Sequence, residues 1–246
     1  MKKQRIDLLL VERGFATSRQ RAQALIMAGA VLANDKVIDK AGTQIATDAN
    51  LRLRGNPLPY VSRGGCKLEH ALDCFGIEPA GLQIVDIGIS TGGFTDCLLQ
   101  RGAAHVTGID VGRGQVAWSL QQDERVTLFE GENIRHFNTA RLTHPVDLVV
   151  VDVSFISLSL VMPVVAEILK SGGRALPMVK PQFEVGREAI GKKGVVRDEA
   201  ARLAAVEKIR LCAVDLGFEF LGETPSPLPG PEGNIEYFLY LSKPGC

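Results

Sequence analysis

The sequence has few cysteine and histidine residues, and they stand far apart. Its five cysteines include no Cys-x-x-Cys pair, and the four histidines form no cluster. An odd and scattered set of cysteines favours neither a disulfide framework nor a zinc site. We therefore expect a cytoplasmic protein, in a reducing compartment, with no bound metal ion. The cysteines are Cys66, Cys74, Cys97, Cys212 and Cys246.

Long apolar runs are absent as well. The longest relevant uncharged stretch, Val153 to Ala166, has 14 residues and contains three serines and a proline. About 20 apolar residues are needed to span a bilayer. The N-terminal sequence MKKQRIDLLLVERG has an apolar run that ends at Glu12 and Arg13, too soon for a signal peptide. The sequence therefore predicts no contact with a membrane.

Net charge is also absent, because 28 basic residues balance 28 acidic ones, but the two signs are unevenly distributed. Residues 1–70 hold 12 Lys and Arg against 6 Asp and Glu, a net charge of +6, which leaves 16 against 22, or −6, for residues 71–246. Such asymmetry indicates a basic part that binds a polyanion. The alternative is a solvated basic face with no partner.

The basic part resembles a small α+β domain in its pattern. One short helix is predicted from about Arg5 to Arg13, and a second follows an N-cap at Ser18 and ends at Gly29. The stretch AVLANDKVID (30–39) is typical of a hairpin. The turn-rich stretch RLRGNPLPYVSRGG (52–65) is typical of a linker. We predict a first domain over 1–60, with the linker from about residue 55, and a second over 61–246.

The second part alternates strand-like apolar runs with longer helical segments. This alternation predicts an α/β domain with a Rossmann-like, mostly parallel sheet covered by helices on both faces. A Pro- and Gly-rich loop (224–233) alone joins the last two runs, so we expect them to be antiparallel. The runs are 83–88, 105–110, 126–131, 147–153, 174–180, 218–223 and 236–242.

A glycine-rich turn follows the first of these strands, in IVDIGISTGGFTD (84–96). Its spacing does not match G-x-G-x-x-G or a P-loop, which argues against NAD and ATP. Asp86 ends the strand, where an acid can hold an amino group. Asp110 ends the next strand, where a carboxylate can accept from both hydroxyls of a ribose. The pair suits adenosine that carries methionine; the alternative is that the glycines serve only a tight turn.

Lys67 raises a separate question in the stretch VSRGGCKLEHAL (61–72). A helix that begins after the double glycine has Lys67 in its first turn, where a cation opposes the helix dipole. The common explanation is an exposed surface lysine. The other is that carboxylates from elsewhere in the fold face its ammonium group.

Several motifs together resemble a known family. DIGISTGGFTD, DVSFIS, VKPQFE, GVVRD and PGPEGNIEYFLYL are similar to those of the TlyA family, ribosomal RNA 2′-O-methyltransferases that also bear the name hemolysin A. The first 60 residues resemble the RNA-binding module named after ribosomal protein S4. The likeness spans nearly the whole chain. Departures are Ile89 for a small residue, Glu132 within EGENIR, and Lys193 for a glycine.

The resemblance implies S-adenosyl-L-methionine as the cofactor, in an FtsJ-like domain, and ribosomal RNA or a ribosomal subunit as the partner. It implies no oligomeric state. The residues that it assigns to the cofactor are Asp86, Gly88, Ser90, Thr91, Gly92, Gly93, Phe94, Asp110, Asn133 and Asp152. With the basic pattern of the first 70 residues, it assigns RNA binding to Arg5, Ser18, Arg19, Arg21, Lys36 and Arg63. Arg19 and Arg21 stand beside helix N-terminal amides, which suits phosphate.

The same resemblance implies the catalytic set Lys67, Asp152, Lys180 and Glu236. A ribose hydroxyl attacks a methyl sulfonium only if its proton is removed as the bond forms, and lysine acts as such a base when burial and a second cation favour its neutral form. We assign Lys180 as the base and Asp152 as the residue that orients it. Lys67 and Glu236 would position the ribose, with two carboxylates facing Lys67.

Other readings of the sequence remain open. A membrane-active hemolysin conflicts with the lack of a spanning or basic amphipathic segment. A noncatalytic RNA-binding or assembly factor conflicts with the complete catalytic set. Amino methylation would need an Asp/Asn-Pro-Pro-aromatic loop, and carbon-5 methylation a cysteine after a catalytic strand. Cytidine ribose in large-subunit RNA is favoured because the chain resembles the family's shorter form, and small-subunit RNA is the alternative.

Overall fold

The computed structural model describes residues 3–16, 18–54 and 58–245. The chain divides into two compact units, residues 1–58 and residues 59–246. Residues 55–57, where the sequence places the start of a linker, lie outside the described residues, as does Cys246.

The described residues of the first unit form two helices and five short strands. Ser18 caps the second helix, because its side chain accepts from the backbone N–H of Arg21 at 3.1 Å. The predicted hairpin is present, with Val31 opposite Ile38 and positive φ angles at Asn34 and Asp35. The elements are β1 (Lys3–Arg5), α1 (Ile6–Glu12), α2 (Arg19–Met27), β2 (Val31–Ala33), β3 (Lys36–Ile38), β4 (Gln44–Ala46) and β5 (Leu51–Leu53).

A fully buried carboxylate, Asp7, joins the two helices of this unit. It accepts hydrogen bonds from Arg5 Nη2 at 2.9 Å, from Arg19 Nε at 2.9 Å and from Gln23 Nε2 at 3.2 Å. The hydrogen bond from Arg5 lowers the pKa of Asp7 below its ordinary value, although burial opposes this. Two arginines that the sequence assigns to RNA therefore share one internal counter-ion, while their side chains remain 40% and 53% exposed.

Replacing Asp7 with Asn should destabilise the first unit by about 1 kcal/mol at pH 7, since each arginine keeps a neutral acceptor only. The folded pKa lies below 3.8, so the stabilisation is present above pH 3.8 and is lost as the pH falls below it. Hydrogen exchange of α1 and α2 amides at pH 7 and pH 3 measures both effects. Asp35→Asn, in an exposed pair with Arg52, is the control. Equal protection of the α1 and α2 amides from exchange in Asp7→Asn and wild type at pH 7 would contradict a stabilising role for Asp7.

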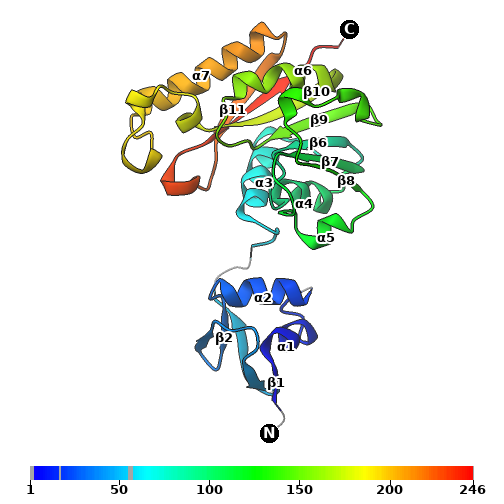
Figure 1. The fold of residues 1–246 in the computed structure, drawn as a ribbon, viewed down its shortest axis with the longest axis vertical. Coiled ribbons are helices and arrows are strands. Elements are labelled where there is room, and N and C mark those ends of the chain that lie inside the picture. Colours follow the sequence, from blue (N-terminus) through cyan, green and yellow to red (C-terminus); the bar gives the residue numbers. More distant parts are fainter. Residues whose placement is uncertain (1–2, 17, 55–57, 246) are drawn as a thin grey trace. The chain divides into compact units, whose positions relative to one another are not determined.

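The second unit is a seven-stranded sheet in the order β11-β12-β10-β9-β6-β7-β8 (Figure 1). The five strands from β10 to β8 in this order are parallel; β12 is antiparallel to β10 and to β11. The predicted mostly parallel sheet with an antiparallel end is confirmed. The strands are β6 (Gln83–Ile87), β7 (His105–Asp110), β8 (Val126–Glu130), β9 (Val146–Val151), β10 (Leu169–Val179), β11 (Glu219–Pro225) and β12 (Tyr237–Ser242).

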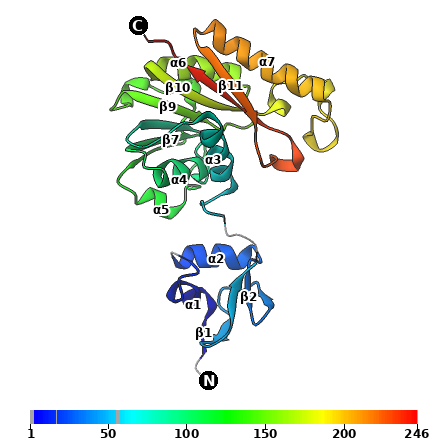
Figure 2. The same cartoon turned by 180° about the vertical axis from the view of Figure 1, so that it is seen from behind.

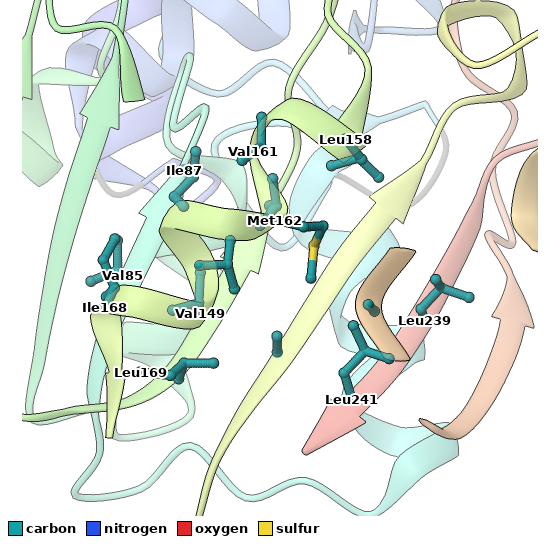
Figure 3. Close-up of a cluster of buried hydrophobic side chains, with 14 of the residues drawn as sticks. Val85, Ile87, Val149, Leu158, Val161, Met162, Ile168, Leu169, Leu239 and Leu241 are labelled. Carbon is teal, nitrogen blue, oxygen red and sulfur yellow. The ribbon is translucent and has the colours of Figure 1, made fainter. Parts of the chain in front are cut away.

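Helices cover both faces of this sheet, as Figures 1 and 2 show. Along β9, Val149 and Val151 pack with the helices of one face, and Leu148 and Val150 with those of the other. Figure 3 shows Met162 among the side chains of the first of these two cores. The first face carries α6 (Met162–Ile168) and α7 (Glu199–Asp215); the second carries α3 (Arg63–Phe75), α4 (Gly93–Gln100) and α5 (Trp118–Gln121).

The strand registers bring the ends of several strands together at one edge of the sheet. Val151 of β9 lies opposite Ile87 of β6 and Pro177 of β10. Val179 of β10 lies opposite Tyr237 of the antiparallel β12. The residues that follow β6, β9 and β10, and the residue that precedes β12, therefore meet at this edge.

Two boundaries differ from the sequence-based expectation. Helix α3 begins at Arg63 and contains both glycines, so Lys67 lies in its second turn, where the dipole effect is weak. Ser62 is the extended residue before the helix, and its carbonyl accepts from Gly65 N at 3.2 Å. Glycine is required inside this first turn, because a Cβ at Gly65 would lie 2.3 Å from the ring of Tyr60. Strand β10 begins at Leu169 rather than near Arg174, with an irregular register between these two residues.

Candidate active site

Two lysine–carboxylate ion pairs lie at this edge of the sheet. Lys67 Nζ is 2.5 Å from Glu236 Oε2, and Lys180 Nζ is 2.6 Å from Asp152 Oδ1. Lys180 Nζ also donates to Ser154 Oγ at 2.9 Å. Both lysines are 8% exposed and Glu236 is fully buried. Charges so far from water need partners, and each lysine has one carboxylate.

The fold places three of these side chains next to the end of a strand and the fourth inside a helix. Asp152 follows β9, Lys180 follows β10, and Glu236 precedes β12, while Lys67 comes from α3. The sequence predicts two carboxylates facing Lys67. This is wrong, because only Glu236 lies within 4 Å of its ammonium group among the described residues.

The four charged side chains line a cavity of about 260 Å³. The glycine-rich turn forms another wall of this cavity with Gly88, Ser90 and Thr91. Arg63, which the sequence assigns to RNA, also lines it. The cavity therefore combines two amines, two carboxylates and a backbone loop.

Glu236 is held by the loop that precedes β12. Its backbone carbonyl accepts from Ser226 N at 2.8 Å. A Cβ at Gly230 would lie 2.2 Å from Glu236 Oε1, and this oxygen has no hydrogen-bond partner among the described residues. Glycine at position 230 therefore leaves the room that this buried carboxylate occupies.

A larger cavity of about 760 Å³ adjoins the first and shares Gly88, Ser90 and Asp152 with it. Asp110 lines it; its two carboxylate oxygens accept from the backbone N–H groups of Ser90 at 2.8 Å and Gly112 at 2.7 Å. Each oxygen keeps a second lone pair for a ligand hydroxyl. Asn133 also lines this cavity.

The glycines of the turn serve close packing as well as the cavity. A Cβ at Gly88, which has φ +86°, would lie 2.5 Å from the carbonyl oxygen of Asp152. A Cβ at Gly92, with φ +94°, would lie 2.2 Å from Leu120. Gly92 and Asp86 line neither cavity, whereas Gly93 and Phe94 line the smaller one.

Asp86 is a fully buried acid directly below the turn. One carboxylate oxygen accepts from Thr95 Oγ1 at 2.7 Å, and the other has no hydrogen-bond partner among the described residues. Burial raises the pKa of Asp86 to about 7, and the nearby Asp152 adds to this, although the bond from Thr95 opposes it. Asp86 lines neither cavity, so its predicted contact with an amino group of the cofactor stays a prediction.

The structure shows the surroundings of the three residues that the sequence analysis gives as departures from the family motifs. Ile89 is 3% exposed and fills the space above β7: a Cβ at Gly108 would lie 2.4 Å from its Cδ1. Glu132 pairs with Arg141 at 2.7 Å. Lys193 adopts φ +65°, the left-handed region that glycine occupies at low cost.

Two site residues were missed in the sequence analysis. Ser154 contacts Lys180, and Glu184 binds the loop after β9. Both stand inside the motifs DVSFIS and VKPQFE, within four residues of a predicted catalytic residue. A side chain that can form hydrogen bonds, so close to a predicted catalytic residue, was the sequence signal that could have identified them.

Among the described residues, no group of three or more His, Cys, Asp or Glu could hold a metal ion. No helix in the described part of the chain is long and apolar enough to cross a bilayer.

Comparison with known proteins identifies the family. The FtsJ-like methyltransferase model matches residues 60–243, and the S4 domain model matches residues 4–51. A 16S/23S rRNA (cytidine-2′-O)-methyltransferase TlyA from Mycobacterium tuberculosis is 46% identical over 96% of this chain and 89% of its own length. The chain belongs to the TlyA family of FtsJ-like methyltransferases.

Other relatives agree with this TlyA assignment. A candidate rRNA methyltransferase of Bacillus subtilis, YqxC, is 46% identical over 99% of this chain and 87% of its own length. Among solved structures, a candidate hemolysin from Streptococcus thermophilus matches with a TM-score of 0.77 and 43% identity, over 99% of this chain and 90% of that one. The TlyA family thus includes proteins with methyltransferase names and proteins with hemolysin names.

Asp86 should make the stability of this TlyA-family protein depend on pH. The pKa of Asp86 in the folded protein, about 7, exceeds the ordinary 3.8. The contribution of Asp86 to the free energy of unfolding is therefore fully present below pH 3.8 and declines as the pH rises to about 7. We expect a loss of about 2 to 4 kcal/mol over this range without ligand. Asp86→Asn should remove this slope, and Thr95→Val should extend it to higher pH. Denaturant unfolding from pH 4 to 8 tests this; parallel curves for wild type and Asp86→Asn would refute it.

Proposed function

We propose that this protein transfers the methyl group of S-adenosyl-L-methionine to the 2′-oxygen of a cytidine in ribosomal RNA. The pairing of Lys180, which lines the smaller cavity, with Asp152, which lines both cavities, carries this proposal. The printed activity of the Mycobacterium tuberculosis relative supports the choice of acceptor. Ribosomes supply that acceptor in the cytoplasm.

The described residues fit the cofactor. Asp110, which lines the larger cavity, has lone pairs left for its ribose hydroxyls, whereas Asp86 lines neither cavity and would act through Thr95 and the turn above it. The absence of a side chain at Gly88 lets the turn pass close to Asp152. Ser90, Thr91, Gly93, Phe94 and Asn133 would line its path, whereas Gly92 would act through packing. When bound, the cofactor supplies an electrophilic methyl group on a sulfonium.

Lys180 is the general base in this proposal. Its neutral amine takes the 2′-hydroxyl proton as the bond from oxygen to the methyl carbon forms and the carbon–sulfur bond breaks. Asp152 and Ser154 hold Nζ in place at 2.6 and 2.9 Å. Lys67 and Glu236 form the other pair and position the ribose.

The first unit supplies RNA affinity through exposed cations. Arg5 and Arg19 project from the Asp7 counter-ion, Arg21 donates to the carbonyl of Leu58, and Lys36 is exposed. The hydroxyl of Ser18 caps α2 and has one acceptor role already filled. Arg63 would contact RNA at the cavity itself.

Large-subunit RNA is the substrate that we propose, with small-subunit RNA as the alternative. The relative from Mycobacterium tuberculosis is named for both RNAs. A hemolytic role is the competing function, because relatives carry that name; prompt leakage of dye-loaded vesicles on addition of pure protein would favour it.

Lys180→Met should lower single-turnover methyl transfer by about 10²- to 10⁴-fold, because the change removes a positioned base but keeps an apolar side chain of similar length. Isolated large and small subunits, with labelled S-adenosylmethionine, give both the rate and the preferred RNA.

Lys170→Met is the matched control, because Lys170 lies at the opposite end of β10 and pairs with Asp147. It should transfer methyl at the wild-type rate. A Lys180→Met protein that transfers at this rate would falsify the base assignment. A protein that modifies neither subunit while it binds both would favour the assembly factor.

Arg19→Ala with Arg21→Ala should weaken RNA binding and reduce its dependence on salt by up to about two phosphate contacts. Calorimetric binding of S-adenosylmethionine should not change, because the cavities belong to the second unit. Arg52→Ala removes an exposed arginine of the same unit that is paired with Asp35, and serves as the comparison. An unchanged salt slope in the double variant would show that α2 is only a solvated face.

A further inference from the structure

Two segments that carry catalytic groups are joined at three places. The first follows β9 and runs over 152–158; the second follows β10 and runs over 180–184. Near the start of both segments, Lys180 binds Asp152 and Ser154. Further along, the rings of Phe155 and Phe183 lie 5.2 Å apart.

Glu184 forms the third of these contacts. Its carboxylate accepts from Ser157 Oγ at 2.5 Å and from the backbone N–H of Leu158 at 2.7 Å. Lys208 of α7 donates to the same carboxylate at 3.1 Å and to the carbonyl of Glu184 at 3.0 Å. The Glu184 side chain is 1% exposed, so these three donors replace the water that a carboxylate would otherwise bind.

The loop held in this way has an unusual backbone. Phe155 lies between Ser154 and the Glu184 contacts, and it has φ +64°, which costs about 1 kcal/mol or more for an aromatic residue. Phe155 is 91% exposed, so burial of its ring does not hold this conformation. The contacts at Ser157 and Leu158 supply fixed points on the C-terminal side of the strained residue.

We propose that Glu184 and Ser157 are positioning residues for methyl transfer. They hold the loop after β9 so that Asp152 and Ser154 meet the amine of Lys180. The short turn from Pro181 to Phe183 makes this coupling stiff, since Phe183 N donates to Lys180 O at 2.9 Å and Glu184 N to Pro181 O at 3.0 Å. The proposal rests on the proposed function, because it assigns Lys180 as the base.

Glu184→Gln is the first test. Glutamine has the same size, but only its single oxygen can accept, so one of the donors from Ser157, Leu158 and Lys208 faces an amide N–H. We expect single-turnover transfer at saturating cofactor and RNA to fall by about 10- to 100-fold, the usual effect of a small misplacement of catalytic groups. Affinities for S-adenosylmethionine and RNA should stay within about twofold of wild type. Ser157→Ala should show the same split with a smaller loss.

A double-mutant cycle separates positioning from general damage. In the Lys180→Met background, Glu184→Gln should have no further effect on the residual rate, because there is no amine left to misplace. A protein that is merely destabilised loses activity equally in both backgrounds. Glu207→Gln, which breaks an exposed pair with Arg210 on the same α7, is the control and should behave as wild type.

The outcomes distinguish this inference from the function on which it rests. If Lys180→Met is inactive while Glu184→Gln and Ser157→Ala transfer methyl at the wild-type rate, the positioning role is wrong and the base assignment stands. Equal losses from Glu184→Gln in both backgrounds also overturn the positioning role. If Lys180→Met is fully active, the proposed mechanism fails first.

Discussion

The pairing of buried charges at one sheet edge is the constraint on which the second unit depends. Lys67, Lys180 and Glu236 are buried there, and an unpaired charge at such a position would cost several kcal/mol, so each lysine needs its carboxylate partner. The sheet topology meets this requirement. An antiparallel β12 beside a parallel β10 brings the start of one strand to the end of the other, which places Glu236 beside Lys180 without a long connection. The preceding glycine, Gly230, gives the carboxylate its room.

The alternation of apolar runs was enough to predict the sheet and its two helical layers. The run 147–153 contains four consecutive apolar residues, Leu148 to Val151, as expected for a strand covered on both sides, and Val149 and Val150 do face different layers. The placement of Asp152, Lys180 and Glu236 also follows from sequence, because each flanks such a run. Local signals were sufficient wherever a residue lies next to the end of a strand.

Contacts between distant segments could not be predicted in this way. Gly65 lies inside α3 because the ring of Tyr60 leaves no room for a side chain there, and the sequence alone does not show that contact. Lys67 has one carboxylate partner rather than two because Asp152 pairs with Lys180 instead. That pairing follows from the position of β9 beside β10 in the sheet. Arg5 and Arg19 read as free cations, yet a buried Asp7 from the adjoining helix binds both. Glu184 was overlooked because an acid near a turn usually faces solvent.

Ile89 and Gly108 show how this family member restricts its own variation. The isoleucine side chain occupies the volume that a Cβ at position 108 needs, and Leu128 lies 3.1 Å from that volume on the other side. A larger residue at position 108 therefore fits only after the side chain at position 89 has become smaller. A chain that gains bulk at 108 before it loses bulk at 89 passes through an overpacked core, whereas the reverse order passes through a small cavity next to the glycine-rich turn. Bulk at position 108 is therefore tolerated only in a protein whose side chain at position 89 is smaller than isoleucine.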